Sequence, residues 1–287
     1  MKGIIASCST LPSRVENENF KKTVTQLTQN KRIDFVYIHY PKFCKRLKID
    51  YPPIPSWMNA NPKIKVNYGV EDCGPLTKVA PLFDLFPHNT TTDLGVFLFD
   101  DDRLYPLLWI EELLDAFNMH GRACVVARQG TLSKTLPFCY DKFNYSKEVQ
   151  QYSCVKTASG VIYPFSCFPN SFNEAINLAE KYKEKASYRN DDMLLASWCY
   201  KTLTPIFIIP VTDEQMKEWY LFNDDKYNDE VSLSAIPNHT KPQIKLAQNM
   251  IQNDDWPIPW PEITIVVVVI VTFILLLAII GLLVKKM

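Results

Sequence analysis

The apolar run from Gly95 to Phe99 limits the possible folds more than any other segment, because it leads directly into Asp100, Asp101 and Asp102. A run of five apolar residues is typical of a strand covered on both faces, since a half-exposed strand alternates apolar and polar side chains. Sheets built from such strands bind ligands at the carboxyl ends of the strands. The segment therefore predicts a central strand of an α/β sheet that delivers three carboxylates to a binding site.

The chain before and after this strand alternates between the two secondary-structure patterns. Strands are predicted at 3–9, 35–40, 63–68 and 123–127, and helices at 17–30, 75–86 and 106–120. This alternation predicts a mostly parallel sheet with helices on both faces. The second half is less regular, with strands at 160–163 and 205–210, helices at 170–185 and 191–201, and an irregular segment over 213–261. We expect one domain over residues 1–235.

A long uncharged segment lies near the C-terminus, where twenty-two residues run from Ile263 to Val284. A helix of that length crosses a hydrocarbon core of roughly 30 Å. Trp256 and Trp260 precede it at the level of the membrane interface, within a closing segment and proline-rich stalk over 236–262. The sequence therefore predicts one transmembrane helix over 263–284, which would make the chain a single-pass membrane protein.

The orientation of this helix is predicted from what surrounds it. Only three residues follow it, and the N-terminus lacks the pattern of a signal peptide. These features favour a C-terminal tail anchor with the catalytic domain in the cytosol. Lys285 and Lys286 favour the opposite orientation under the positive-inside rule.

Composition excludes one class of partner and gives the expected state of the cysteines. The 31 basic and 31 acidic residues balance, so the chain lacks the positive charge that binds nucleic-acid phosphates. The eight cysteines form no Cys-x-x-Cys pair or zinc-type spacing with histidine, which favours reduced thiols over disulfides.

The aspartate triplet predicts a metal site. Three adjacent carboxylates repel one another unless a cation lies among them, and oxygen ligands with open positions suit Mn²⁺ or Mg²⁺. Such an ion can also bind a diphosphate and act as a Lewis acid on a departing nucleoside diphosphate. A solvated acidic loop is the alternative.

Three segments together resemble one enzyme family. Residues 97–106, Phe-Leu-Phe-Asp-Asp-Asp-Arg-Leu-Tyr-Pro, resemble the strand and Asp-x-Asp motif of GT-A glycosyltransferases, in the family 2-like branch with an aspartate triplet and Tyr-Pro. Residues 9–14, Ser-Thr-Leu-Pro-Ser-Arg, resemble the loop that contacts the nucleotide, and residues 72–78 resemble the Asp-x-Gly-Pro-x-Thr-Lys element. The resemblance implies a GT-A fold, which is Rossmann-like with a mostly parallel central sheet flanked by helices.

The resemblance also implies roles for residues around the nucleotide sugar. Thr10 and Pro12 lie in the loop that contacts the base and ribose. Asp100 faces the ribose or base side, Asp102 ligates the metal, and Asp101 lies between them.

Three further side chains suit the donor for chemical reasons. Arg14 and Lys78 are cations that suit a diphosphate, and Asp72 can accept hydrogen bonds from a base or ribose. The alternatives are ordinary surface cations for Arg14 and Lys78, and for Asp72 a helix cap before Pro75.

The second half supplies the expected acceptor side. Residues 159–164 resemble the acceptor loop, in which a small residue lets the backbone approach the sugar, and residues 189–194 resemble an acidic motif at a helix start. Transfer to a hydroxyl needs a carboxylate that takes its proton, and Asp191 or Asp192 is the predicted base. The alternative is that this pair only caps the helix. His239 is a further predicted metal ligand, with a merely exposed loop histidine as the alternative.

These patterns predict a membrane-anchored, metal-dependent enzyme that moves a sugar from a nucleotide-sugar donor to a hydroxyl of a glycan, protein or lipid, with inversion if Asp191 or Asp192 is the base. Two alternatives stay open. A nucleotidyltransferase predicts a glycine-rich phosphate loop after the first strand, where this chain has Ser-Thr-Leu-Pro-Ser-Arg. A non-catalytic membrane adaptor with a degenerate GT-A fold predicts that the triplet binds no ion.

Overall fold

The structure is a computed structural model that describes residues 2–223 apart from 87–92, 132–143, 146–149, 152–153 and 182–190. The predicted stalk over 236–262, the predicted membrane helix over 263–284 and His239 lie outside these residues, as does the domain boundary near 235. No helix within the described ranges is both long enough and apolar enough to cross a bilayer.

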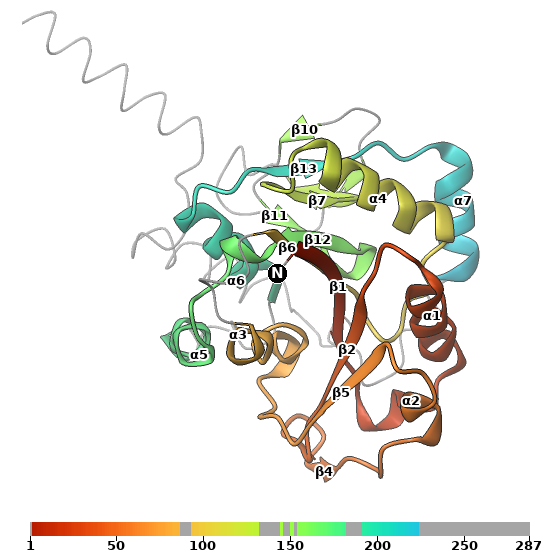
Figure 1. Ribbon diagram of the computed structural model, residues 1–287, viewed down its shortest axis with the longest axis vertical. Helices are drawn as coiled ribbons and strands as arrows, with labels where there is room; N and C mark the ends of the chain where they lie inside the picture. The colour runs from red at the N-terminus through yellow and green to blue at the C-terminus, as the bar shows by residue number, and fades with distance from the viewer. Residues whose placement is uncertain are drawn as a thin grey trace, which may run out of the picture.

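The core of the fold is an eight-stranded sheet in the order β10-β13-β7-β12-β6-β1-β2-β5 (Figure 1). Its strands are β1 (Lys2–Ser9), β2 (Phe35–Tyr40), β5 (Ile64–Tyr68), β6 (Asp93–Leu98), β7 (Val125–Ala127), β10 (Gln150–Gln151), β12 (Val161–Pro164) and β13 (Ile206–Ile208). Strands β6, β1, β2 and β5 run parallel to one another, as do β7 and β13. The predicted mixed α/β class with a mostly parallel sheet is confirmed.

Helices cover both faces of the sheet, as Figure 1 shows. The α-helices are α1 (Glu18–Gln29), α2 (Ser56–Asn59), α3 (Leu82–Leu85), α4 (Leu107–Met119), α5 (Phe172–Lys181), α6 (Asp191–Lys201) and α7 (Asp213–Phe222). Side chains of α1, α4 and α7 pack on one face, and those of α3, α5 and α6 on the other.

The apolar runs explain this two-sided burial, because successive side chains of a strand point to opposite faces. On β1, Ile5 joins the core under α3, α5 and α6, whereas Ile4 and Ala6 join the core under α1 and α4. On β6, Val96 and Phe97 divide in the same way. The central strands therefore carry apolar residues at most positions, as the sequence pattern indicated.

Smaller elements lie around the rim of the sheet. Strands β3 (Phe43–Cys44) and β4 (Ile49–Asp50) form a hairpin, and β8 (Gln129–Thr131), β9 (Asn144–Tyr145) and β11 (Cys154–Val155) form a three-stranded sheet. The 3-10 turns within the described residues are η1 (Pro12–Arg14), η2 (Gly74–Lys78), η5 (Thr157–Ser159) and η6 (Phe165–Cys167). The seven cysteines in the described part of the chain are free and buried.

Two predictions of local structure were wrong. The helix expected over 75–86 is divided into η2 and α3, because Pro81 precedes α3 and a proline inside a helix removes a hydrogen bond. The segment from Asp213 is not irregular but begins with α7, which Thr212 and Gln215 open with a capping box. The strand predicted at 160–163 is present as β12; its direction was not predicted, and it runs antiparallel to both β6 and β7.

Candidate functional site

A cavity of about 540 Å³ lies at the carboxyl ends of β1 and β6. All three predicted motifs contribute to its wall, and so do the two candidates for the base, Asp191 and Asp192. Among the lining residues are Thr10, Arg14, Asp72, Lys78, Asp100, Asp101, Asp102, Asp191 and Asp192. Pro12 begins η1 beside this wall but does not line the cavity. The fold thus brings together segments that lie more than 180 residues apart in the sequence.

Asp101 holds the loop that follows β1. One carboxylate oxygen accepts a hydrogen bond from the Leu11 N–H at 2.9 Å, and the other accepts from Arg14 Nη1 at 2.9 Å. Arg14 Nη1 also lies 3.0 Å from Asp102 Oδ2, and the arginine side chain is buried. Asp101 and Arg14 therefore contact each other, whereas the sequence analysis had assigned both to the donor.

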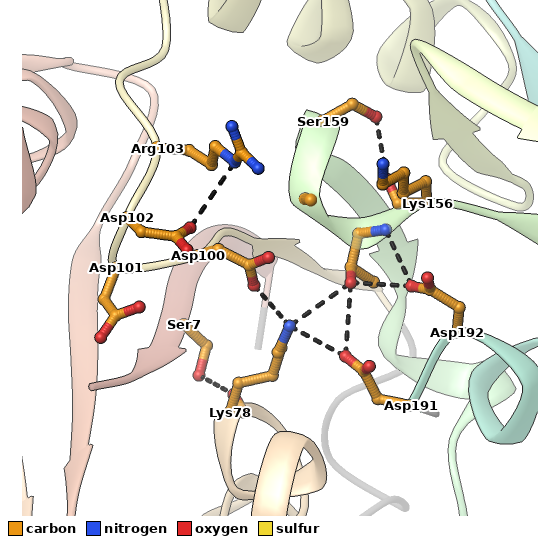
Figure 2. Close-up of polar contacts among 12 residues, drawn as sticks. Ser7, Lys78, Asp100, Asp101, Asp102, Arg103, Lys156, Ser159, Asp191 and Asp192 are labelled. Atoms are coloured by element: carbon orange, nitrogen blue, oxygen red, sulfur yellow. Dashed lines mark hydrogen bonds and ion pairs between the residues drawn. The ribbon is translucent and has the colours of Figure 1, made fainter. Parts of the chain in front are cut away.

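Lys78 joins the two predicted acid groups. Its Nζ lies 2.5 Å from Asp100 Oδ1 and 2.8 Å from Asp191 Oδ2, and its side chain is only 8% exposed (Figure 2). Burial alone would lower the pKa of Lys78, but these two carboxylates hold it well above its usual value. Burial alone would likewise raise the pKa of Asp100, which Lys78 instead keeps below its usual value. The ammonium is therefore charged and links the end of β6 to the start of α6.

Tyr105, from the Tyr-Pro part of the triplet motif, ties the triplet to the η5 turn. Its hydroxyl accepts a hydrogen bond from the Asp100 N–H and donates one to the Ala158 carbonyl, both at 3.0 Å. Trp109 adds a second link, because its Nε1 donates to the Ser159 carbonyl at 2.8 Å. The backbone of the second half is thereby fixed relative to the aspartates of the first.

Asp191 and Asp192 lie in the first turn of α6, where the helix dipole favours negative charge. Both are buried, at 8% and 7% exposure. Asp192 Oδ1 accepts two hydrogen bonds from Thr157, one from its N–H at 2.9 Å and one from its hydroxyl at 2.8 Å. Burial and next the charge of Asp191 raise the pKa of Asp192 to about 6. Such a carboxyl exchanges its proton near neutral pH.

The remaining aspartate of the triplet has an unusual charge environment. Burial, followed by the charge of Asp101, raises the pKa of Asp102 to about 6 even though Arg14 lies close. The residues described by the structure contain no group of three His, Cys, Asp or Glu side chains arranged for a metal. Magnesium, however, is commonly held by one or two carboxylates plus substrate phosphates. Asp100 and Asp102 line the cavity and are of the ligand type that such an ion prefers.

Asp72 contacts backbone around the rim of the cavity. Its carboxylate accepts from the Gly74 N–H at 2.8 Å and from the Lys45 N–H at 2.7 Å. The contact with the Gly74 N–H closes an Asx turn at the start of η2. This role resembles the helix cap that was the alternative for Asp72. The contact with the Lys45 N–H holds the β3-β4 hairpin beside the cavity.

Tyr51 and Thr157 are among the residues of this site that sequence reasoning missed. Tyr51 lines the cavity, donates its hydroxyl to the Thr10 carbonyl at 2.7 Å and packs against Tyr40. It follows an ordinary hairpin in a proline-rich stretch, where no pattern marks it. Thr157 lies two residues before the Ser159-Gly160 pair that the acceptor-loop resemblance had indicated, and that neighbourhood was the available signal.

No protein-family model matches the sequence, and no curated protein matches it either. Solved structures of similar fold include a 4-diphosphocytidyl-2C-methyl-D-erythritol synthase, at 10% identity and a TM-score of 0.46, covering 78% of this chain and 100% of that one. They also include the Francisella tularensis 2-C-methyl-D-erythritol 4-phosphate cytidylyltransferase, at 12% identity and a TM-score of 0.42, covering 77% and 99%. A CMP:2-keto-3-deoxy-manno-octonic acid synthetase complexed with CTP has 10% identity and a TM-score of 0.43, covering 74% and 90%. These values describe a distant likeness in the path of the chain.

Proposed function

We propose that this chain is a metal-dependent glycosyltransferase that moves a sugar from a nucleoside diphosphate to a hydroxyl acceptor. The observation that carries the proposal is the meeting of two acid groups in one cavity: the triplet at the end of β6 and the pair at the start of α6, joined by Lys78. Sugar transfer needs one acidic group to hold a metal and diphosphate and another to take a proton.

The charges of the cavity support the need for a metal. Six basic and six acidic residues line it, so its wall has no net formal charge. The two cations expected to meet the diphosphate already contact carboxylates, Arg14 with Asp101 and Lys78 with Asp100. A diphosphate therefore needs additional positive charge. When bound by Asp100 and Asp102, Mn²⁺ or Mg²⁺ supplies that charge and stabilises the leaving diphosphate as a Lewis acid.

The protein's own part in the reaction is to take a proton. The acceptor oxygen forms a bond to the anomeric carbon while the bond from that carbon to the diphosphate oxygen breaks, and the diphosphate leaves with the electron pair. We assign the acceptor proton to Asp192 rather than to Asp191, because Asp191 is paired with the Lys78 ammonium. A base whose pKa is about 6 is ionised at neutral pH and still accepts a proton readily. Direct displacement of this kind inverts the anomeric centre.

Cytidylyl transfer is the second candidate, because the similar structures include a cytidylyltransferase and a synthetase complexed with CTP. A likeness of this degree does not decide between the two reactions. The loop after β1 is unlike a glycine-rich phosphate loop, since it forms the turn η1 with Pro12 at its start.

Product analysis with the full chain in mild detergent separates the candidates. The detergent accommodates the C-terminal anchor, which remains part of the proposal. One reaction contains Mn²⁺ and a panel of nucleotide sugars, and release of nucleoside diphosphate is measured. A parallel reaction contains nucleoside triphosphates with sugar phosphates, and release of pyrophosphate is measured. Nucleoside diphosphate from one donor supports the glycosyltransferase, pyrophosphate supports the nucleotidyltransferase, and neither product supports a non-catalytic adaptor.

A further inference from the structure

The η5 turn, Thr157–Ser159, has its position fixed from the donor side of the cavity. The Tyr105 hydroxyl donates to the Ala158 carbonyl at 3.0 Å while it accepts from the Asp100 N–H. Trp109 Nε1 donates to the next carbonyl, that of Ser159. Side chains that follow the aspartate triplet thus hold two successive carbonyls of the turn.

Gly160 ends this turn in a conformation that other residues rarely adopt, with φ of +81°. A Cβ at this position would lie 3.1 Å from ring carbons of both Phe97 and Tyr105. The sequence analysis expected a small residue in this loop so that the backbone could approach a sugar. The contacts give a different reason, because the backbone of Gly160 packs against the aromatic core.

Thr157 connects this turn to the two aspartates at the start of α6 through its hydrogen bonds. The residue is 2% exposed, and its hydroxyl lies 2.8 Å from Asp192 Oδ1, 3.3 Å from Asp191 Oδ2 and 3.3 Å from Lys78 Nζ. A hydroxyl has one proton and can also accept. The short distance identifies Asp192 as its acceptor, and the ammonium of Lys78 donates to it. Together with its N–H, Thr157 makes two bonds to one oxygen of Asp192.

We propose that Thr157 is a positioning residue, which fixes the direction of the Asp192 carboxylate relative to the aspartate triplet. The inference rests on the proposed function, in which Asp192 takes the proton of the acceptor. Two bonds to Oδ1 fix the plane of the carboxylate, and the chain of contacts from Asp100 through Tyr105 and the turn sets where that plane lies. Transfer is sensitive to such placement, because reacting groups must meet within hydrogen-bond reach.

Thr157→Val and Thr157→Ser form the matched pair that tests this role. Valine keeps the branched shape and the N–H but removes the hydroxyl, whereas serine keeps the hydroxyl. The assay uses the full chain and a nucleotide sugar that it accepts as a substrate. We expect Thr157→Val to lower kcat by about 10- to 100-fold, which is part of the roughly 10²- to 10⁴-fold rate enhancement that proton transfer contributes. The KM for the donor should change by less than about threefold, because in the proposed function the aspartate triplet and its metal hold the donor, and the substitution leaves the triplet unchanged. Thr157→Ser should keep kcat within about threefold of the native value.

Combination with Asp192→Asn separates positioning of Asp192 from a general structural role. If Thr157 acts through Asp192, Thr157→Val causes no further loss of kcat once Asp192 is Asn. An equal loss in both backgrounds, native kcat in Thr157→Val, or equal losses in kcat and donor affinity would each overturn the proposal. Circular dichroism checks folding, and Thr157→Ala replaces the valine variant if that variant does not fold.

Urea unfolding keeps this inference distinct from the proposed function. The midpoint shifts of Thr157→Val and Asp192→Ala should be non-additive in the double variant, whether or not the chain turns over a sugar donor, because alanine removes the oxygen that accepts from Thr157. Additive shifts of the urea midpoint would show that Thr157 and Asp192 do not interact, which would overturn the proposal. Non-additive shifts without any turnover by the native chain would overturn the proposed function, and with it the catalytic meaning of the contact.

Discussion

Replacing Lys78 with methionine tests the charge network that joins the two acid groups. The substitution keeps an unbranched side chain of similar length and removes the ammonium, which leaves Asp100 and Asp191 buried beside each other. Their side chains are 24% and 11% exposed, so water screens them weakly. Removing one partner of a buried ion pair typically costs about 3–5 kcal/mol. Because Asp100 is partly exposed, we expect a loss near the lower end, about 3 kcal/mol in the free energy of unfolding.

The pH dependence of this loss follows from the sign of the pKa shift. Lys78 lowers the pKa of Asp100 in the native protein, so this pair contributes stability above the pKa of the unfolded carboxyl and loses it as pH falls. In Lys78→Met, burial is no longer opposed by the ammonium, so the pKa of Asp100 rises and the carboxyl can take a proton. The difference in stability between the two proteins should therefore be larger at pH 8 than at pH 5.

Urea unfolding of the full chain at these two pH values measures the effect. Lys21→Met is the matched control, because Lys21 also contacts two carboxylates, those of Glu16 and Glu18, but does so at the surface. We expect no measurable change in its midpoint. A loss below about 1 kcal/mol for Lys78→Met, or an equal loss at pH 5 and pH 8, would refute the assignment of Lys78 as the charged link between the acid groups.

Two further predictions concern catalysis and the η5 turn. The kcat of the native chain should rise with pH through about 6, since the base must be deprotonated. Asp192→Asn should lower kcat by about 10²- to 10⁴-fold and remove this rise. A kcat that stays constant from pH 5 to pH 8 in the native chain would contradict the assignment of Asp192 as the base. Gly160→Ala should cost about 1–3 kcal/mol in urea unfolding, because it combines positive φ with close contacts to Phe97 and Tyr105. Gly121→Ala is its control, with φ of +65° but nothing within 4 Å of the added Cβ, and equal losses in both would show that the contacts contribute nothing.

Sequence patterns predicted the main elements because the physics behind them is local. The apolar run before Asp100 placed β6 in the centre of the sheet, and α6 has the predicted bounds, Asp191–Lys201. The helix α7 was missed although two local signals for it were present. Thr212 and Gln215 have the capping-box spacing, and Met216, Trp219 and Tyr220 follow at helical intervals.

The contacts within the site could not be predicted in the same way. Lys78 meets Asp191 across 113 residues of sequence, and periodicity carries no information about which side chains pair over such a distance. The sequence indicated that Lys78 and Arg14 are cations near a diphosphate. It did not indicate that both are already bound to carboxylates, which depends on how the strand ends and the start of α6 meet in three dimensions.

The proposed function requires that Asp102 hold the metal on which sugar transfer depends. Its most direct test is the rate at which the full chain releases nucleoside diphosphate from its preferred nucleotide sugar, measured against Mn²⁺ concentration. Asp115→Asn is the control, since Asp115 lies on α4 and pairs with Arg32 at the surface. We predict saturable dependence on Mn²⁺ in the native and control proteins, and loss of both the rate and the dependence in Asp102→Asn. Equal rates with and without the metal, or an unchanged response in Asp102→Asn, would show that Asp102 does not hold a metal needed for transfer.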